Sequence, residues 1–600
     1  METATAAAVP HQTEAKTIAD LLPVAVADFG SLPAVRYKDD SGSWVSKTYE
    51  EVGEIVSKLS LGLIDLGVEK GDKVAILSNT RAEWSYYDFA ALTAGATVVP
   101  IYQTNSPEEC QYVLENSDAK VVIVEDDEQM AKVREIREQC PLLEHAVRIV
   151  GDSSDAMTTQ NLIDRGAAGT RADWEARWRS VTPDDICTFI YTSGTTGPPK
   201  GCVISHGNYR AMCDMALGVD VLNPGEVTYL FLPLAHSFAL LIQLLSFSVG
   251  GTLAYWERDP LKIVPNLSEV RPTYFPSVPR IFEKIYTAAT SAVEKEGGLK
   301  KTVFDWAIGV GKKVRALERQ DKRPGPLLAL QHRMADKQVL SKIRSLFGGN
   351  LKEAVTGAAP INPEILEFFD AAGLLVVEGW GMTETSTAAT ISTAEAFKWG
   401  TVGKPFPGCE IKIAADGEIL VKGPNVFQGY YKNEEATRET IVDGWLHTGD
   451  IGEIDSDGYI KITGRKKDII ITAGGKNITP ANLEAEIKQH PLVSQCVVVG
   501  DRRPYLIALL TLDPEEAEKY AGEHEISADA LPSDPTVRAS IQAHLDQVNE
   551  KFARVEQVKK FEVLDRDLSQ AEGELTPTMK VKRNVVAEKY AGEVDALYAE

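Results

Sequence analysis

Short apolar runs typical of β-strands alternate with helical patterns along most of this chain, and this alternation limits its fold more than any other feature. The runs at 73–77, 96–101 and 120–126 are strand-like, and a helical pattern at 84–94 separates the first two. The alternation continues as far as residue 465. Parallel strands whose crossover helices cover the sheet produce this pattern. We therefore predict an α/β fold in which parallel or mixed sheets are layered with helices.

The length of the chain requires more than one domain. Its 600 residues exceed the size at which a single hydrophobic core stops growing. A lysine-rich turn and a Gly-Gly loop begin at Gly464 and precede a compact α/β segment. We therefore expect a large domain over residues 17–465 and a small α+β domain over residues 466–600. Residues 1–16 lack a basic region followed by an apolar core, so we expect a disordered tail rather than a secretory signal.

The charge balance excludes one class of function. The chain has 87 acidic and 63 basic side chains, a net charge of −24 and a pI near 5.0. A polyphosphate chain would meet repulsion over most of this surface, so we expect no nucleic-acid partner. Seven scattered cysteines without a C-x-x-C pair indicate neither a disulfide framework nor a thiolate metal site. We expect them to be reduced and mostly buried, in a cytoplasmic protein.

One uncharged stretch must be weighed as a membrane span. Residues 227–256 contain no Asp, Glu, Lys or Arg. A spanning helix needs about 20 mainly apolar residues, whereas Pro233 and His236 interrupt this run. We instead expect a buried helix at 238–249 followed by a strand at 252–255.

The segment from 284 to 350 differs in composition from the rest of the chain. It carries 14 Lys and Arg against 6 Asp and Glu, which gives +8 in a chain of net charge −24. Its residues favour helix, so we expect a basic helical insert in the large domain. Its apolar side chains could either dip into a membrane interface or pack the insert onto the large domain, and we favour the packing; they include Phe304, Trp306, Leu327 and Leu328.

Residues 191–201, YTSGTTGPPKG, have the chemistry of a phosphate-binding loop. They follow an apolar strand and combine four Ser and Thr hydroxyls with three glycines and Lys200. Glycine lets backbone N–H groups approach oxyanions closely, while hydroxyls and lysine add donors and charge. The spacing is not that of a Walker A loop, because Gly194 and Gly197 are three apart and Lys200 precedes Gly201. Composition alone would favour a solvated turn, and the neighbouring motifs change this interpretation.

Five further motifs follow the loop in order: TGAAP (356–360), EGWGMTET (378–385), WLHTGD (445–450), GRKKD (464–468) and TPTMKVKR (576–583). With them, the chain resembles the adenylate-forming superfamily of acyl-CoA synthetases, adenylation domains and luciferases over nearly its whole length. Residues 271–286, with the insert after them, and AGGKNITP at 473–480 are similar to the long-chain fatty acid:CoA ligases of that superfamily.

The resemblance implies an enzyme that uses ATP, Mg2+ and coenzyme A and takes a fatty acid as its substrate. The carboxylate would attack the α-phosphate of ATP and release pyrophosphate, and the acyl group would then pass from AMP to the thiol of coenzyme A. Two anions meet in the first step, so a lysine, a metal ion and fixed donors are expected. The large domain would be the AMP-binding (adenylation) domain, and the small domain would be mobile.

The matched motifs imply a polyphosphate and metal site. Lys200 and the loop would hold the β- and γ-phosphates; the loop residues are Thr192, Ser193, Gly194, Thr195, Thr196 and Gly197. Glu384 would bind Mg2+, a hard cation that takes a carboxylate together with phosphate oxygens and water. Thr383 would donate a hydrogen bond to the α-phosphate. Outside its motif, Glu384 would be interpreted as a surface acid at the end of a helix.

A second set of residues would bind the nucleoside. The adenine would lie against small side chains and an aromatic ring, in two segments made of Gly357, Ala358 and Ala359 and of Gly379, Trp380, Gly381 and Met382. Asp450 would accept the ribose hydroxyls, and Arg465 would add a contact. Most members of the superfamily have tyrosine where this chain has Trp380, whose indole stacks equally well but lacks the hydroxyl.

Two basic groups would act on the carboxylate. Lys580 would bridge it to the α-phosphate, with Lys582 and Arg583 as alternatives by position. His236 would line the carboxylate pocket, and the alternative is a satisfied core histidine. We do not expect His236 to be a general base, because a fatty carboxylate is already ionised at neutral pH.

The small domain would reorient after adenylation. Its hinge would be Lys467 or Asp468, and the loop containing Gly474 and Gly475 would then approach the coenzyme A channel. A long-chain acid resides largely in membranes, so we expect the basic insert to contact an anionic membrane surface from the cytoplasmic side. The chain length of the acid and a homodimer are left open.

Three other classes of protein remain as alternatives. A fatty acyl-AMP ligase would pass the adenylate to a carrier protein rather than to coenzyme A. A P-loop phosphotransferase would need a different loop spacing. A nucleotide-binding scaffold without activity would not need Glu384 and Lys580 together with the phosphate loop.

Overall fold

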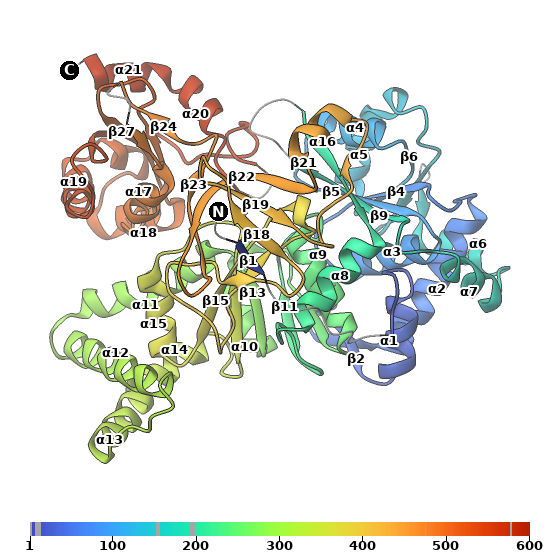
Figure 1. Ribbon diagram of the computed structural model, residues 1–600, viewed down its shortest axis with the longest axis horizontal. Coiled ribbons are helices and arrows are strands. Elements are labelled where there is room, and N and C mark those ends of the chain that lie inside the picture. The colour runs from blue at the N-terminus through green and yellow to red at the C-terminus, as the bar shows by residue number, and fades with distance from the viewer. Residues whose placement is uncertain are drawn as a thin grey trace.

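The computed structural model describes residues 3–5, 14–151, 156–192, 198–473, 476–576 and 579–599. A layered α/β body makes up most of the molecule, and a smaller unit, coloured orange to red, lies against one end of it (Figure 1). The two parts have separate hydrophobic cores. The core of the body extends as far as Ile460, and that of the smaller unit begins at Ile470. The predicted α/β class is confirmed.

Two large sheets form the centre of the body. In the described chain, the first has the strand order β20 (Gly429–Tyr430), β10 (Lys200–Ser205), β9 (Ile186–Thr192), β5 (Thr97–Ile101), β4 (Lys73–Leu77), β6 (Ala119–Val124), β7 (His145–Arg148) and β8 (Met157–Thr158). The second has the order β17 (Lys404–Pro405), β16 (Thr390–Ile391), β15 (Leu375–Trp380), β14 (Glu353–Thr356), β13 (Tyr274–Ser277), β11 (Val227–Leu230), β12 (Thr252–Tyr255), β2 (Pro33–Lys38) and β3 (Trp44–Thr48). The central pairings of both sheets are parallel.

A third, antiparallel sheet completes the body. Its order is β1 (Thr3–Thr5), β18 (Glu410–Ile413), β19 (Glu418–Lys422), β22 (Trp445–Ile454) and β21 (Ile441–Val442), and β23 (Ile460–Arg465) pairs with β22. The smaller unit has a two-stranded ladder of β24 (Ile470–Ile471) and β25 (Asn477–Ile478), and a sheet of β26 (Val493–Val499), β27 (Leu506–Leu512) and β28 (Val558–Val563).

Helices cover the sheets of the body. Those before the insert are α1 (Leu21–Phe29), α2 (Tyr49–Asp65), α3 (Ala82–Thr93), α4 (Pro107–Asn116), α5 (Asp127–Glu135), α6 (Thr159–Gly166), α7 (Arg171–Arg179), α8 (His206–Leu217), α9 (Ser237–Ser248) and α10 (Ile263–Val270). Local sequence explains several starts, because Thr48 with Glu51 and Ser106 with Glu109 form capping boxes that satisfy the first N–H groups of α2 and α4.

The later helices belong to the insert, the end of the body and the smaller unit. They are α11 (Pro279–Glu296), α12 (Gly298–Glu318), α13 (Pro326–Ala335), α14 (Ser341–Ser345), α15 (Pro363–Ala371), α16 (Glu434–Thr440), α17 (Pro480–Ile487), α18 (Pro514–His524), α19 (Pro535–Glu550), α20 (Arg583–Lys589) and α21 (Ala591–Ala599).

The uncharged stretch folds inside the body. Its helix, α9, has 12 residues and is followed by β12, as expected from the sequence. No helix in the described chain is long and apolar enough to cross a membrane. All seven cysteines are free and buried, as predicted.

The tail differs from the expected disorder at two places. Thr3–Thr5 pairs antiparallel with β18, and Ala15 is only 1% exposed. The pairing arises because β18 presents an unpaired edge, and a short extended segment can satisfy its hydrogen-bonding groups. Residues 1, 2 and 6–13 lie outside the described part.

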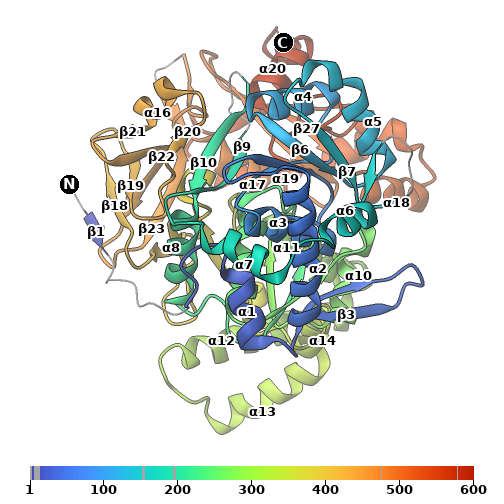
Figure 2. The same cartoon turned by 90° about the vertical axis from the view of Figure 1, so that its right-hand side faces the viewer.

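Of the side chains expected to pack the insert onto the body, Phe304 does so, whereas two others pack within the insert itself. The Phe304 ring lies 6.1 Å from that of Phe368, and Trp306 and Leu328 pack around a small cluster that includes Ala307. The expectation is wrong for Leu327, which is 70% exposed. It lies on α13, a helix that projects from the body (Figures 1 and 2).

A row of ion pairs joins the body to the smaller unit between α11 and α18. Arg280 lies 2.5 Å from Asp513, and Lys284 lies 3.0 Å from Glu515. Lys295 pairs with Glu523 further along the same two helices. This row, which we call the α11–α18 row, holds α18 against the body.

A buried carboxyl couples the stability of the body to pH. Asp88 on α3 is 1% exposed, and Gln243 on α9 donates a hydrogen bond to it at 2.7 Å. Burial raises the pKa of Asp88 to about 7, against which this hydrogen bond acts. In the unfolded chain, Asp88 has an ordinary pKa of about 3.9. Between this pH and about 7, the native protein therefore keeps a proton on Asp88 that the unfolded chain has lost.

We predict that the free energy of unfolding decreases relative to Asp88→Asn as the pH rises from about 4 to 7. The native state binds the extra proton in this window, so the decrease is at most about 4 kcal/mol. Denaturant unfolding of both proteins between pH 4 and pH 8 measures it. Parallel pH profiles would contradict the prediction.

Candidate active site

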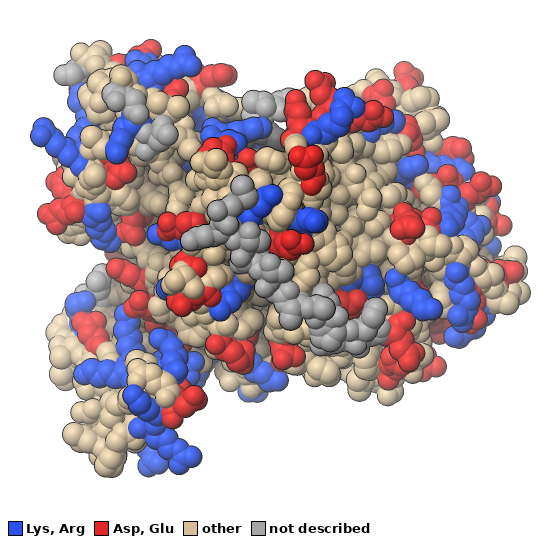
Figure 3. Space-filling view, viewed as in Figure 1, with Lys and Arg blue, Asp and Glu red and all other residues tan. Residues whose placement is uncertain are grey.

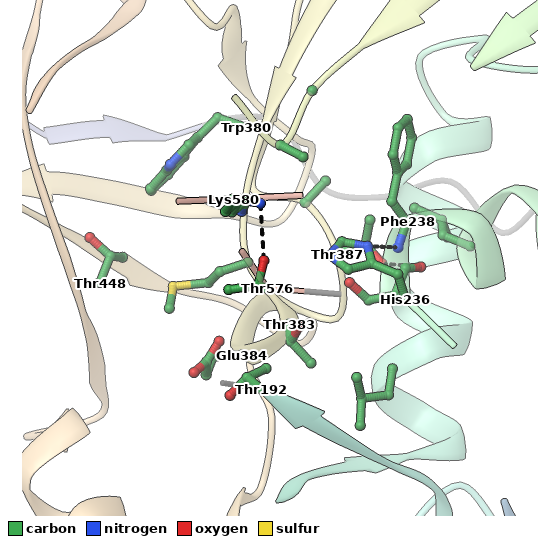
Figure 4. A pocket seen from close by; sticks show the side chains of 18 of the residues that line it. Thr192, His236, Phe238, Trp380, Thr383, Glu384, Thr387, Thr448, Thr576 and Lys580 are labelled. Carbon is green, nitrogen blue, oxygen red and sulfur yellow. Dashed lines mark hydrogen bonds between the residues drawn. The ribbon is translucent and has the colours of Figure 1, made fainter. Parts of the chain in front are cut away.

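A cavity of about 580 Å³ lies where the sheets of the body meet the smaller unit (Figure 4). It brings together many of the residues that the sequence motifs suggested: Thr192, Lys200, His236, Gly357, Ala358, Gly379, Trp380, Gly381, Met382, Thr383, Glu384, Arg465, Lys467 and Lys580. The predicted residues Ser193, Gly194, Thr195, Thr196, Gly197, Gly474 and Gly475 lie outside the described part.

Three predicted residues do not line the cavity. Ala359 is exposed, because the chain turns at Ala358, whose φ is 69°. Asp468 lies beyond the cavity, and its backbone N–H donates to the carbonyl of Arg465 at 2.9 Å. Asp450 lies behind the lining residues and is hydrogen-bonded to two of them, Trp380 and Arg465.

Asp450 connects the aromatic ring to the arginine of the site. The indole Nε1 of Trp380 donates to one carboxylate oxygen of Asp450 at 2.9 Å, and Nε of Arg465 donates to the other at 2.9 Å. Asp450 is 8% exposed, so both bonds are shielded from bulk water. The indole N–H of Trp380 thus orients Asp450. Most members of the superfamily have tyrosine at this position. In this chain, therefore, an indole N–H rather than a phenol hydroxyl is the aromatic donor available to the carboxylate.

Glu384 lies at the end of β15 in a short helical turn, Thr383–Thr385. Its side chain is largely buried, with 7% of the residue exposed. The hydroxyl of Tyr430 donates to Glu384 Oε1 at 2.7 Å, and the backbone N–H of Phe427 donates to its carbonyl at 2.9 Å. Tyr430 lies outside the six motifs, and the sequence reasoning missed it.

Lys580 enters the cavity from the smaller unit. It ends a tight turn in which its carbonyl accepts from the N–H of Thr576 at 2.8 Å and its own N–H donates to the Thr576 hydroxyl at 3.1 Å (Figure 4). Lys580 is accessible to solvent, but its side chain lines the cavity, where the surrounding protein replaces much of the bulk water. This desolvation, followed by the charge of Arg465, lowers the pKa of Lys580.

The neighbouring basic side chains of the same turn differ in their surroundings. Arg583 is engaged with Glu484 inside the smaller unit. Lys582 lines the cavity, so it remains an alternative to Lys580.

The contacts of His236 bear on both roles considered from the sequence, a lining residue of the carboxylate pocket and a satisfied core histidine. It caps α9, since its Nδ1 accepts the N–H of Phe238 at 3.2 Å, and it also lines the cavity. Burial, followed by the charge of Lys580, lowers the pKa of His236 to about 3. The ring is therefore neutral, and because Nδ1 accepts, its proton is on Nε2. This leaves a neutral N–H donor and no catalytic base at neutral pH.

One branch of the cavity is apolar. The residues of α9 that line it lie on one face of the helix and follow His236 in the order Phe238, Leu241, Ile242 and Leu245. At 1.5 Å per residue, the distance from His236 to Leu245 along the helix is about 13 Å. Ala216 and Tyr274, each 1% exposed, also line the cavity. The cavity thus has a polar end with Lys580 and an apolar part lined by α9.

The residues at the polar end fit a magnesium ion. Among the described residues, no cluster of three or more His, Cys, Asp or Glu could hold a metal alone. Glu384 is a single carboxylate with one oxygen bonded to Tyr430. Mg2+ is commonly held by one or two carboxylates together with substrate phosphates and water, so this donor set suits a metal that arrives with a polyphosphate.

Lys466, directly before the connection to the smaller unit, is bonded to the body. The Lys466 ammonium pairs with Asp416 at 2.7 Å and with Glu418 at 3.0 Å, and its backbone N–H donates to Gly449 at 2.8 Å. Glu418 also accepts from His447 at 3.0 Å. These bonds attach Lys466 firmly to the third sheet.

Comparison with known proteins identifies the class to which this site belongs. The AMP-binding enzyme family matches residues 22–431, and the AMP-binding enzyme C-terminal domain matches residues 467–600. The chain therefore belongs to the AMP-binding enzyme family. The resemblance inferred from the six motifs is confirmed.

Individual relatives make the comparison more specific. The long-chain-fatty-acid–CoA ligase FadD15 of Mycobacterium tuberculosis is 42% identical over 564 residues, which cover 93% of each chain. The long-chain-fatty-acid–CoA ligase ACSBG2 of Gallus gallus is 36% identical over 98% of this chain and 81% of the relative. The adenylation domain of the carboxylate reductase from Mycobacterium chelonae shares the fold, with a TM-score of 0.76 over 97% of this chain and 91% of that chain at 22% identity.

We predict that Ala216→Leu shifts the preferred acid toward shorter chains. The added carbons occupy the apolar branch, and each methylene that no longer fits loses about 0.8 kcal/mol, or about fourfold in kcat/KM. The values of kcat/KM for saturated acids from C8 to C18 measure the shift. Ala211→Leu, on the same helix but outside the cavity lining, is the control. An unchanged chain-length profile in Ala216→Leu would contradict the prediction.

Proposed function

We propose that the protein activates a long-chain fatty acid with ATP and then transfers the acyl group to coenzyme A. The observation that carries the proposal is the position of Lys580, at the polar end of a cavity whose other branch is apolar. A fatty acid needs both environments, since its carboxylate must meet a phosphate while its chain avoids water. The similarity to FadD15 supports the same substrate class.

The first step joins two anions. A carboxylate oxygen forms a bond to the α-phosphorus of ATP, and the bond from that phosphorus to the bridging oxygen breaks as pyrophosphate leaves. Lys580 is the cation best placed to screen both anions, because its ammonium lies in a region of reduced solvation where charge interactions are strong. The neutral ring of His236 supplies a further donor without requiring a proton transfer.

The second step passes the acyl group to sulfur. The thiol of coenzyme A loses its proton, its sulfur bonds to the acyl carbon, and AMP leaves with the electron pair of the broken carbon–oxygen bond. We infer that the small domain, residues 466–600, turns between the steps about Lys467 or Asp468. The bonds that attach Lys466 to Asp416 and Glu418 favour a pivot directly after that residue.

The nucleotide would be bound as the motifs imply. We assign Lys200 and Thr192 to the β- and γ-phosphates, and Trp380 with Asp450 to the nucleoside. Glu384 would hold Mg2+, which neutralises polyphosphate charge when bound. Thr383, beside it, would donate to the α-phosphate.

The reaction itself tests the proposal and separates it from the alternatives. Purified protein is incubated with Mg2+, ATP, coenzyme A and acids from C8 to C20, and AMP, pyrophosphate and acyl-CoA are measured. Formation of all three products supports the proposal. Products that require a carrier protein instead of coenzyme A would favour an acyl-AMP ligase. No ATP consumption by the folded protein would reject both readings and favour a scaffold.

We predict that Lys580→Ala blocks the first half-reaction and spares the second. Loss of the bridging charge costs about 3 kcal/mol in acyl-AMP formation, which is roughly a 100-fold decrease in rate. Conversion of supplied acyl-AMP to acyl-CoA should stay near the wild-type rate. Lys582→Ala, the neighbouring lysine that also lines the cavity, is the matched comparison. Equal damage to both half-reactions would indicate a structural role, and a stronger effect of Lys582→Ala would transfer the role to that residue.

We further propose that α13 contacts an anionic membrane surface from which the acid is drawn. Leu327, Leu330 and Met334 are 70%, 56% and 50% exposed, and their spacing of three and four residues places them on one face. Figure 3 shows lysines and arginines gathered over the same projecting helices. An apolar face beside cations suits the boundary between headgroups and acyl chains.

The charges of α13 give a cleaner test than those of α12. On α12, Lys300 and Lys301 pair with acids of the same helical hairpin, and Lys312 pairs with Glu367 at 2.8 Å. Arg323, just before α13, and Arg333, on it, are exposed.

We predict that the wild-type protein co-sediments with vesicles of phosphatidylglycerol and phosphatidylcholine, more at low salt than at high salt. Arg323→Glu/Arg333→Glu should weaken binding at least tenfold, since each basic residue near the surface contributes about 1 kcal/mol. Leu327→Asp/Leu330→Asp should also weaken it. Leu261→Asp, at a position 68% exposed elsewhere on the body, is the control. No binding by the wild type, or equal binding by all variants, would refute the contact.

A further inference from the structure

Tyr430 lies between two charged side chains of the site. Its hydroxyl donates to Glu384 Oε1 at 2.7 Å, and the Lys200 ammonium lies 5.0 Å from the centre of its ring. Both charged residues line the cavity, and so does Tyr430. One aromatic side chain therefore contacts the carboxylate expected to bind a metal and the lysine expected to bind phosphate.

The backbone around Tyr430 is fixed. Tyr430 is paired with Cys202 in the neighbouring strand β10, and its N–H donates to the Thr437 hydroxyl at 2.9 Å. The preceding residue, Gly429, has a φ of 133°, and a Cβ there would lie 2.6 Å from Thr437. Glycine is needed at that position, because the strained backbone and the close methyl group exclude a side chain.

The ring of Tyr430 is also held in place. It packs edge-on against Phe427, with ring centres 4.9 Å apart and planes at 74°. Phe427 is itself bonded through its N–H to the carbonyl of Glu384. The tyrosine, the phenylalanine and the Glu384 turn thus form one packed unit before any ligand binds.

We propose that Tyr430 is a positioning residue, which holds the Glu384 carboxylate so that Oε2 is presented to a divalent cation, and which steadies the Lys200 ammonium beside the same polyphosphate. This inference rests on the proposed role of Glu384. Its physical basis is that a carboxylate with one oxygen already bonded to a fixed neutral donor has lost most of its freedom to rotate. Outer partners of this kind change metal affinity by roughly 10- to 100-fold.

Tyr430→Phe tests the hydroxyl while keeping the ring. The probe is Mn2+, whose binding is followed by electron paramagnetic resonance with a nonhydrolysable ATP analogue at fixed concentration. We expect the apparent dissociation constant for Mn2+ to rise about tenfold or more. In steady state, the Mg2+ concentration for half-maximal acyl-AMP formation should rise in proportion, and conversion of supplied acyl-AMP to acyl-CoA should not change.

Two further variants make the outcomes distinguishable. Tyr431→Phe is the matched control, because that neighbouring hydroxyl bonds to Asp118 at 2.9 Å and lies outside the cavity lining, and it should bind Mn2+ like the wild type. Glu384→Gln should lose Mn2+ binding. If Glu384→Gln binds Mn2+ normally, the proposed metal role of Glu384 fails. If Glu384→Gln loses binding while Tyr430→Phe, folded by its thermal melting curve, retains it fully, the positioning role of Tyr430 is overturned.

Discussion

The proposed chemistry of the cavity depends on one charged group, the ammonium of Lys580. It belongs to the smaller unit but lies inside a cavity of the body, where desolvation and Arg465 act against its charge. The backbone next to Lys580 is bonded to the rest of the smaller unit, because the N–H of Lys582 donates to the carbonyl of Glu574 at 2.8 Å. Glu574, fully buried, provides this support, since it accepts from Arg566 at 2.8 Å and from the Tyr590 hydroxyl at 3.1 Å at the base of the turn.

The carboxylates of the site are oriented largely by neutral donors. The indole of Trp380 holds Asp450, and the hydroxyl of Tyr430 holds Glu384. His236 is neutral as well and caps α9. A neutral donor fixes direction without cancelling charge, so Glu384 would keep its charge for the proposed metal, whereas Asp450 is also paired with the cation of Arg465 at 2.9 Å. The polar groups of the site are therefore preorganised, because none of them has to turn when charge develops during a reaction.

The sequence predicted those parts of the fold that depend on local pattern. The run at 73–77 is β4, because a parallel strand buried on both faces is apolar without interruption. The motif residues converge because they follow strands whose ends meet at one place.

Tyr430 could not be found this way, since its bond to Glu384 joins residues 46 apart in sequence. The outward direction of Leu327 likewise depends on how α13 leaves the body, which no local pattern specifies. Ala359 was misplaced because a single left-handed residue, Ala358, redirects the chain.

The α11–α18 row would affect the turn of the smaller unit that we propose. The three pairs join the body to the smaller unit, so a turn about Lys467 would have to separate them all at once. Each pair is a partly exposed contact of the kind worth at most about 1 kcal/mol, so together they bias one arrangement without trapping it. Because dissolved ions screen such pairs over about 8 Å at physiological ionic strength, the salt content of the surroundings sets how long the two units remain docked. If the smaller unit turns as proposed, the timing of turnover would depend on the solution, although the chemistry would take place in a sheltered cavity.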